Sequence, residues 1–374
     1  MRIGILTYHK SYNYGAFLQA YALSKRLLSE GYNTEIINFN MPASAKNYRV
    51  VSKDPREMLF KFRLYKSFRE SFSTVSLSEK CLYSDDCDDF VTFIKGEYDV
   101  IIAGSDEIWK TDGVRGFPNP YWLGGDLHCR KISYAASSRS DLSALSVAKQ
   151  SILRSLINDF EFIGVRDIYT YKEISKYIDV HSRLHLCCDP TFTYDFNPDS
   201  DRGKEILNKK YGIDTSKKCI GLMTRDKNLV KALKSEFSAV NLISLYEFNS
   251  TIHNLPNLSP FEWIDVVASI DFLATNFFHG ACFALLTNTP FIAIDVRSAS
   301  YEQSKLYDLL YRENLLDRFA FKKDRSYISS IIDACKQGVN GEKPCFSQAV
   351  MNQKALFQPF IVHLKSNDKV QRDD

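Results

Sequence analysis

His279 is the residue whose type and position most clearly suggest chemistry. It lies in the stretch ATNFFHGACFALLTNTPFIAID, from Ala274 to Asp295. Ile270–Thr275 is an apolar run typical of a strand, a polar turn follows it, and Ala281–Leu286 is typical of a small-residue helix before a second strand. This order predicts a βαβ unit, whose first turn lies at the carboxyl edge of a parallel sheet. His279 would then lie near a helix N-terminus, a position that attracts anions. It could contact an anion or act as an acid or base, or it could be a structural histidine.

Two further polar groups follow predicted strands. The apolar run Tyr98–Gly104 leads to Asp106, which could cap a helix or bind hydroxyl groups. The run Phe160–Val165 leads to Arg166, whose guanidinium can form paired hydrogen bonds with a phosphate or a carboxylate. The alternative is that Arg166 and Asp167 pair with neighbouring side chains.

The chain begins with a third unit of this kind. Its strand, helix and second strand are predicted at Arg2–Thr7, Ala16–Leu28 and Asn33–Phe39. The loop between the first strand and the helix lacks the GxGxxG fingerprint of dinucleotide-binding proteins. Asn13, Tyr14 and Gly15 could line a cleft at this edge, or they could serve only to cap the helix.

Composition limits the classes of function. The 374 residues, with 45% hydrophobic and 25% charged, are typical of a soluble globular protein with room for two domains. The net charge of +3 is too small to favour nucleic acid as a partner. No apolar run reaches the roughly 18–20 residues of a membrane span, and the N-terminus shows no signal-peptide pattern. The expected location is the cytoplasm.

Nine cysteines are present without a CxxC pair or a regular spacing. Free buried thiols in a reducing compartment account for them better than a zinc site or a catalytic cysteine. No cluster of metal ligands is evident, so we expect metal-independent turnover and no cofactor.

The segment Lys46–Phe72 is rich in Lys and Arg, with aromatic residues between them. One interpretation is a basic surface that approaches an anionic membrane or a lipid-linked phosphate. The other is a solvated helix that packs through its aromatic side chains.

The order of elements predicts α/β architecture with two Rossmann-like domains facing a cleft, a GT-B-like fold. The polar stretch Thr193–Asn208 is the expected linker, and Cys219–Thr224 begins the second series. The predicted domains are residues 1–195 and 196–345. Residues 346–374 would form a C-terminal helix, at Ala349–Leu364, that packs back on the first domain, followed by a tail.

Six motifs in order resemble the polysaccharide pyruvyl transferase family, and the likeness covers most of the chain. They are Gly4–Thr7 with Asn13–Leu23, Gly104–Trp109, Ser133–Ser137 followed by Val165–Asp167, Asp189–Thr191, Ser259–Trp263, and Thr275–Gly280. The chain departs from the family at Phe277, where the family usually has Ser before Phe-His-Gly. The family's basic residue after the histidine is matched by Arg297 or by Lys305.

The resemblance implies transfer of a pyruvyl group from phosphoenolpyruvate, the co-substrate, to two hydroxyls of a sugar as a cyclic ketal. Arg166 would clamp the donor, and His279 would act as the acid or orient the departing phosphate. Asp106, or less readily Asp167, would accept protons. Substrate contacts would come from Asn13, Tyr14, Gly15, Ser105, Asn276, Phe278, Gly280, and Arg297 or Lys305.

The acceptor implied is a polysaccharide or lipid-linked precursor at the inner face of the cytoplasmic membrane, with Lys46–Phe72 as a peripheral membrane contact. Two other functions remain open: a GT-B glycosyltransferase that uses a nucleotide sugar, and a non-catalytic sugar-phosphate binding protein.

Overall fold

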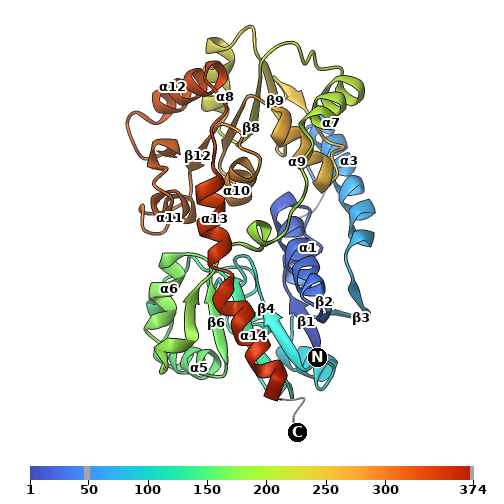
Figure 1. The fold of residues 1–374 in the computed structure, drawn as a ribbon, viewed down its shortest axis with the longest axis vertical. Helices are drawn as coiled ribbons and strands as arrows, with labels where there is room; N and C mark the ends of the chain where they lie inside the picture. Colours follow the sequence, from blue (N-terminus) through green and yellow to red (C-terminus); the bar gives the residue numbers. More distant parts are fainter. Residues whose placement is uncertain (46–50, 371–374) are drawn as a thin grey trace. The chain divides into compact units, whose positions relative to one another are not determined.

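The chain folds into two compact units, each built on one parallel β-sheet flanked by helices (Figure 1). The computed structural model describes residues 1–45 and 51–370. The first unit comprises Met1–Arg49, Ser73–Tyr194 and Gln353–Asp374, and the second comprises Val50–Phe72 and Asp195–Asn352.

The first unit holds a seven-stranded sheet in the order β3-β2-β1-β4-β5-β6-β7. Its strands are β1 (Arg2–Leu6), β2 (Asn33–Asn40), β3 (Leu77–Tyr83), β4 (Val100–Ala103), β5 (Arg130–Ala136), β6 (Phe162–Val165) and β7 (Leu184–Leu186). All neighbours pair in parallel, so each connection must cross over the sheet. The order reverses between β1 and β4, which is the point where open α/β sheets bind ligands.

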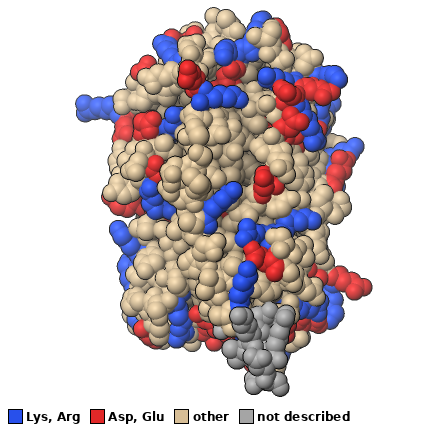
Figure 2. Space-filling view, in the orientation of Figure 1, with Lys and Arg blue, Asp and Glu red and all other residues tan. Residues whose placement is uncertain are grey.

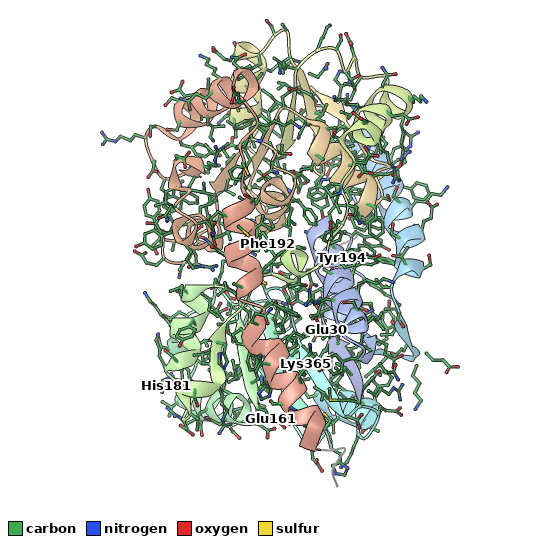
Figure 3. All side chains as sticks on the ribbon, viewed as in Figure 1. Glu30, Glu161, His181, Phe192, Tyr194 and Lys365 are labelled. Carbon is green, nitrogen blue, oxygen red and sulfur yellow. The ribbon has the colours of Figure 1, made fainter. Side chains whose placement is uncertain are left out.

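Helices cover both faces of this sheet. They are α1 (Tyr14–Ser29), α2 (Pro42–Ala45), α4 (Cys87–Ile94), α5 (Val147–Asn158), α6 (Ile168–Ser175) and α14 (Gln358–Val370). Helix α14 follows α13 (Ser347–Ala355) and packs its Phe360 ring 4.5 Å from the ring of Tyr134. Lys365 of α14 also pairs with Glu30 at the end of α1, at 2.6 Å (Figure 3). Helix α14 is thereby part of the first unit. The predicted single helix Ala349–Leu364 is instead divided into α13 and α14, and residues up to Asn352 of α13 belong to the second unit.

The second unit holds a six-stranded parallel sheet in the order β10-β9-β8-β11-β12-β13. Its strands are β8 (Cys219–Met223), β9 (Asn241–Ser244), β10 (His253–Asn254), β11 (Phe272–Thr275), β12 (Phe291–Asp295) and β13 (Phe319–Phe321). Numbered within the unit, this is the Rossmann order 3-2-1-4-5-6, and the reversal falls between β8 and β11.

The helices of the second unit include one that comes from the N-terminal part of the sequence. They are α3 (Pro55–Ser71), α7 (Ser200–Glu205), α8 (Lys227–Glu236), α9 (Pro260–Ser269), α10 (Phe278–Leu286), α11 (Lys305–Arg312) and α12 (Tyr327–Asn340). Helix α9 begins with a capping box in which Ser259 and Glu262 satisfy each other's backbone N–H groups. Apolar residues of α8 and α12 complete the core, among them Leu229 and Ile331.

Three further predictions need correction. Residues 50–72 belong to the second unit, although they lie between β2 and β3 of the first, so residues 1–195 do not form one domain. The helix after β11 begins at Phe278, three residues before the predicted Ala281, and this places His279 inside its first turn. All nine cysteines are free, as expected, but Cys81 and Cys345 are exposed, and Cys87 and Cys129 are only partly buried.

The surface carries both signs of charge. Figure 2 shows Lys and Arg interspersed with Asp and Glu over the face in view, in keeping with the net charge of +3. Within residues 1–45 and 51–370, no helix combines the length and the apolar character that crossing a bilayer requires.

Candidate active site

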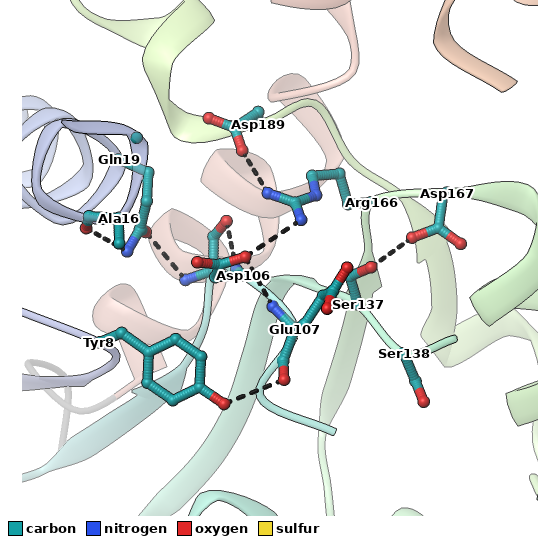
Figure 4. A network of polar contacts seen from close by, with 12 residues as sticks. Tyr8, Ala16, Gln19, Asp106, Glu107, Ser137, Ser138, Arg166, Asp167 and Asp189 are labelled. Carbon is teal, nitrogen blue, oxygen red and sulfur yellow. Dashed lines mark hydrogen bonds and ion pairs between the residues drawn. The ribbon is translucent and has the colours of Figure 1, made fainter. Parts of the chain in front are cut away.

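In the first unit the loops that follow β1 and β4 meet at the reversal point of the sheet. The hydroxyl of Thr7 donates to the carbonyl of Ser105 at 3.0 Å. The hydroxyl of Tyr8 donates to the carbonyl of Glu107 at 3.0 Å (Figure 4). Gln19 of α1 joins the two loops, because its amide donates to Thr7 at 2.9 Å and accepts from the backbone of Ser105 at 3.3 Å. These bonds fix the loop after β4 in place.

Arg166 is buried at this edge between two carboxylates. Its Nη1 donates to Asp189 Oδ2 at 2.6 Å, and its Nη2 lies 3.4 Å from Asp106 Oδ1 (Figure 4). Only 1% of the arginine side chain is exposed. Burial alone would lower the pKa of Arg166, but Asp189 and then Asp106 outweigh it and raise the pKa above its usual value. The guanidinium is therefore a permanent buried cation.

Asp106 is the member of this group that solvent can reach, with 17% of its side chain exposed. Its backbone adopts φ 83°, a left-handed conformation that is uncommon for residues other than glycine and is found at functional sites. The carbonyl of Asp106 accepts from the backbone of Ser137 at 2.9 Å, and its carboxylate accepts from the backbone of Glu107 at 2.8 Å. Asp106 is thus held firmly, with its carboxylate at the carboxyl edge of the sheet.

Asp167, the weaker candidate for a proton acceptor, caps α6. Its carboxylate accepts from the backbone of Thr170 at 2.8 Å and from the hydroxyl of Ser137 at 2.6 Å (Figure 4). It is buried. These contacts account for its position by local structure.

The other predicted contacts of this unit are largely enclosed. Asn13 caps α1, since its side-chain oxygen accepts from the backbone of Gly15 at 2.9 Å and of Ala16 at 3.3 Å. Tyr14, Gly15 and Ser105 are buried. Capping therefore explains Asn13, and a substrate contact for these four residues stays a prediction.

In the second unit the corresponding position is the turn from β11 to α10. The backbone N–H of Asn276 donates to the carbonyl of Met223, at the end of β8, at 3.0 Å. Phe277 is the N-cap residue and makes no side-chain cap, so the helix start lacks the oxygen that Ser would supply there. Instead its ring meets the ring of Tyr246 edge-on at 5.1 Å. At Phe277 an aromatic ring contact therefore takes the place of the polar helix cap that Ser could form.

His279 occupies the first turn of α10, with 8% of its surface exposed. The next residue, Gly280, has no free space for a side chain. A Cβ on Gly280 would overlap the hydroxyl oxygen of Thr275 and would lie 3.0 Å from Thr275 Cβ. The missing side chain lets the helix start pack directly on the end of β11.

A lysine from another helix reaches this turn. Lys305, the first residue of α11, places its Nζ 5.3 Å from the centre of the Phe278 ring. Arg297 lies on the loop after β12 with its side chain exposed, and its backbone N–H donates to Asp295 at 2.8 Å. Lys305 therefore lies beside the turn that carries His279, and a donor contact for Arg297 or Lys305 stays a prediction.

Sequence reasoning missed two groups at these edges. Asp189 is not among the predicted site residues, although an Asp-Pro-Thr turn after a strand is a signal for a carboxylate at the sheet edge. Arg225 follows the strand β8 closely, and its guanidinium lies 2.8 Å from Glu247. Within the two described ranges, no group of three or more His, Cys, Asp or Glu side chains could hold a metal ion.

Comparison with known sequences finds one family. The sequence model described as polysaccharide pyruvyl transferase matches residues 13–298, which includes the edges of both sheets. A search of curated proteins finds no match.

Comparison with solved structures identifies the fold. UDP-GlcNAc 2-epimerase from Methanocaldococcus jannaschii aligns with a TM-score of 0.54 at 10% identity, over 98% of this chain and 100% of that chain. Sucrose-phosphate synthase from Thermosynechococcus elongatus aligns with 0.54 at 11% identity, over 100% and 98%. Anabaena HepE, in complex with UDP and glucose, aligns with 0.52 at 12% identity, over 98% and 100%. These neighbours are GT-B enzymes, so the predicted GT-B-like fold is confirmed.

Proposed function

Because the chain belongs to the polysaccharide pyruvyl transferase family, we propose that it moves a pyruvyl group from phosphoenolpyruvate onto a saccharide. The acceptor we propose is a sugar of a polysaccharide precursor, carried on a lipid, and the product is a cyclic ketal. The observation that carries the proposal is the turn from β11 to α10, where an imidazole, a helix start and a lysine converge.

The donor carries a carboxylate and a phosphate, so its site must supply positive charge and N–H donors. The N-terminus of α10 supplies aligned backbone dipoles, and Phe277 leaves it without a side-chain cap. Lys305 adds a full charge close to Phe278. This combination suits a small doubly anionic molecule.

The chemical step requires a proton at the methylene carbon of the donor. Protonation makes the adjacent carbon resemble an oxocarbenium ion, which two sugar hydroxyls attack in turn while the bond to the phosphate oxygen breaks. His279 is the residue that we assign to this proton transfer, or to the departing phosphate. The products are the ketal and inorganic phosphate. Of the two protons that the sugar hydroxyls lose, one balances the proton added to the methylene carbon and the other is taken up by the phosphate.

In the first unit, Asp106 is the proposed proton acceptor for the sugar hydroxyls. Its carboxylate is partly exposed and is held by Arg166. Because Arg166 is buried in two ion pairs, we propose that it positions Asp106 and does not contact the donor itself. The proposed role of Arg166 is thus to position Asp106, in place of the direct contact with the donor that the sequence suggested.

Release of inorganic phosphate tests the proposal. Purified protein is incubated with phosphoenolpyruvate and a panel of lipid-linked saccharides, and phosphate is measured against an acceptor-free control. His279→Gln should lower kcat by about 10²–10⁴ and change KM for the donor little, since acid catalysis is lost. Unchanged kcat in this variant would exclude the assigned role.

The same assay distinguishes pyruvyl transfer from the alternative function, glycosyl transfer from a nucleotide sugar. That function would release a nucleoside diphosphate from a sugar nucleotide and no phosphate from phosphoenolpyruvate. A protein that phosphoenolpyruvate stabilises against heat, without any turnover, would instead be a binding protein.

A further inference from the structure

Helix α3 is anchored on the second unit through one side. Phe60, Leu64 and Phe68 are buried, and the ring of Phe60 lies 5.9 Å from the ring of Phe248. The guanidinium of Arg56 lies 6.0 Å from the same Phe248 ring. The helix starts from an Asp54 cap with Pro55 in its first turn. One face of α3 is thus fixed to the protein.

The opposite face of α3 carries large apolar side chains in solvent. Met58, Leu59 and Phe62 are 40%, 49% and 54% exposed. Met58 and Leu59 are adjacent, and Phe62 lies one turn after them on the same side of the helix, so the three form one continuous patch. Exposed apolar side chains grouped in this way mark an interaction site, because scattered single residues are the normal case.

Basic side chains continue this face toward the end of the helix. Arg63, Lys66 and Arg69 are exposed, and Lys66 lies four residues after Phe62 on the same side. Within the described residues, these three cations form no ion pair, whereas Lys61 pairs with Glu57 at 2.7 Å. Glu70 is the exposed carboxylate on this side. The face therefore combines an apolar tip with an excess of positive charge.

We propose that this face of α3 docks onto a bilayer that contains anionic phospholipids. Met58, Leu59 and Phe62 would enter the boundary between headgroups and acyl chains, and Arg63, Lys66 and Arg69 would contact the headgroup phosphates. This is the pattern of interfacial helices, in which apolar burial and attraction to anionic lipid act together.

Charge complementarity favours a membrane over a second copy of the chain. A copy would place like charges of the two α3 helices near each other, at a cost in binding free energy. A bilayer instead offers headgroup phosphates to the basic residues and hydrocarbon to the apolar ones. The inference deepens the proposed function, since a lipid-linked acceptor lies at such a surface, but it does not depend on the donor chemistry.

The test is co-sedimentation of the full chain with vesicles of phosphatidylcholine alone or mixed with phosphatidylglycerol. Two double variants are used, Leu59→Gln with Phe62→Gln and Arg63→Glu with Lys66→Glu. The matched control is Lys227→Glu with Lys231→Glu, which reverses two exposed charges on α8 of the same unit. Because all six positions are exposed, the variants should unfold at the wild-type temperature.

The expected result is binding of the wild type to the mixed vesicles, weakened by salt, and much weaker binding to phosphatidylcholine. Each α3 variant should lose at least about tenfold in partitioning, and the α8 control should match the wild type. Wild-type protein that ignores mixed vesicles, or α3 variants that bind like the wild type, would overturn the proposal.

Two further measurements distinguish membrane docking from dimer formation and from the donor chemistry. Sedimentation velocity that shows a wild-type dimer, converted to monomer by Leu59→Gln with Phe62→Gln, would assign the face to a second copy and overturn membrane docking. Phosphate release with a water-soluble acceptor should be equal in the wild type and the α3 variants. If vesicle binding fails while this activity stands, the docking inference fails alone, and the reverse outcome rejects only the proposed function.

Discussion

Arg166 and Asp189 form an ion pair of 2.6 Å in which the side chains are 1% and 0% exposed. The same guanidinium lies 3.4 Å from Asp106, which is partly exposed. One buried cation therefore joins a carboxylate of the core to a carboxylate at the sheet edge. Arg166 is therefore a buried structural residue, and Asp106 is the residue of this group that solvent can reach.

This arrangement predicts that substitutions of Arg166 and of Asp106 affect the stability of the protein to different extents. Arg166→Ala should reduce the free energy of unfolding by about 3–5 kcal/mol, because it removes the positive charge that compensates the buried carboxylate of Asp189. Asp106→Asn keeps the size and one oxygen, so it should change the free energy of unfolding by less than about 1 kcal/mol. Urea titration followed by circular dichroism measures both. Asp106→Asn should nevertheless lower phosphate release.

The control for this pair is donor binding. If Arg166→Ala unfolded like the wild type but lost affinity for phosphoenolpyruvate, Arg166 would be a donor clamp after all. A loss of stability with retained donor affinity supports the positioning role.

A second prediction compares the two basic residues near the donor turn. Lys305→Ala should raise KM for phosphoenolpyruvate by about 10–100-fold, the loss of one charge-assisted contact. Arg297→Ala should change KM by less than about threefold, because its side chain is exposed to solvent on the loop after β12. Steady-state kinetics of both variants decide the matter. A larger effect for Arg297 would show that the loop after β12 supplies the donor cation.

The fold could be predicted largely from local patterns. Apolar runs such as Tyr98–Gly104, followed by polar turns, specify parallel strands, and alternating helices then leave few topologies. The edges that carry Asp106 and His279 follow from the same rule. What the patterns could not show is where α3 packs, because its burial depends on Phe248, far away in the sequence.

The site was predictable in position more than in role. The residue type of Arg166 suggested an anion clamp, but its partners are set by three separate strand ends that meet only in the folded sheet. Likewise, the position of Lys305 beside Phe278 depends on the packing of α11 against α10. Sequence spacing carries no information about such contacts.

A third prediction tests the assignment of α3 to the second unit. Phe60→Ala should reduce the free energy of unfolding by about 3–5 kcal/mol, since a buried ring is replaced by a cavity beside Phe248. Phe62→Ala, two residues along the same helix, should change it by about 0.5 kcal/mol or less, because that ring is exposed. Hydrogen exchange should show α3 amides losing protection in Phe60→Ala together with amides of β9. Loss of protection with β2 and β3 instead would contradict the assignment.

A fourth prediction concerns the close contact below His279. Gly280→Ala should destabilise the protein by about 1–3 kcal/mol, although alanine is the better helix former, because the added methyl overlaps Thr275. Adding Thr275→Ala should recover part of the loss, and a double-mutant cycle measures this coupling. Gly113→Ala is the control, as its methyl would meet only Lys110 at 3.9 Å. Additive effects of the two substitutions would mean that the overlap is relieved by other movements.

The last prediction is a pH dependence that arises at His9, which follows β1 and is buried. Burial lowers the pKa of His9 to about 4, and its Nδ1 lies 3.3 Å from the carbonyl of Thr7. In the unfolded chain a histidine has a pKa of about 6.5, so protons bind the unfolded state more readily. The stabilisation by neutral His9 is therefore complete above about pH 6.5 and is lost as the pH falls toward 4.

The difference of pKa corresponds to about 3 kcal/mol across this interval. His9→Gln, which cannot titrate, should flatten the pH dependence of the free energy of unfolding between pH 4 and 6.5 by about this amount. Urea titrations at several pH values measure it, with the exposed His181→Gln in the same unit as the control. A wild-type pH profile in His9→Gln, or an equal flattening in His181→Gln, would show that the buried ring of His9 is not its source.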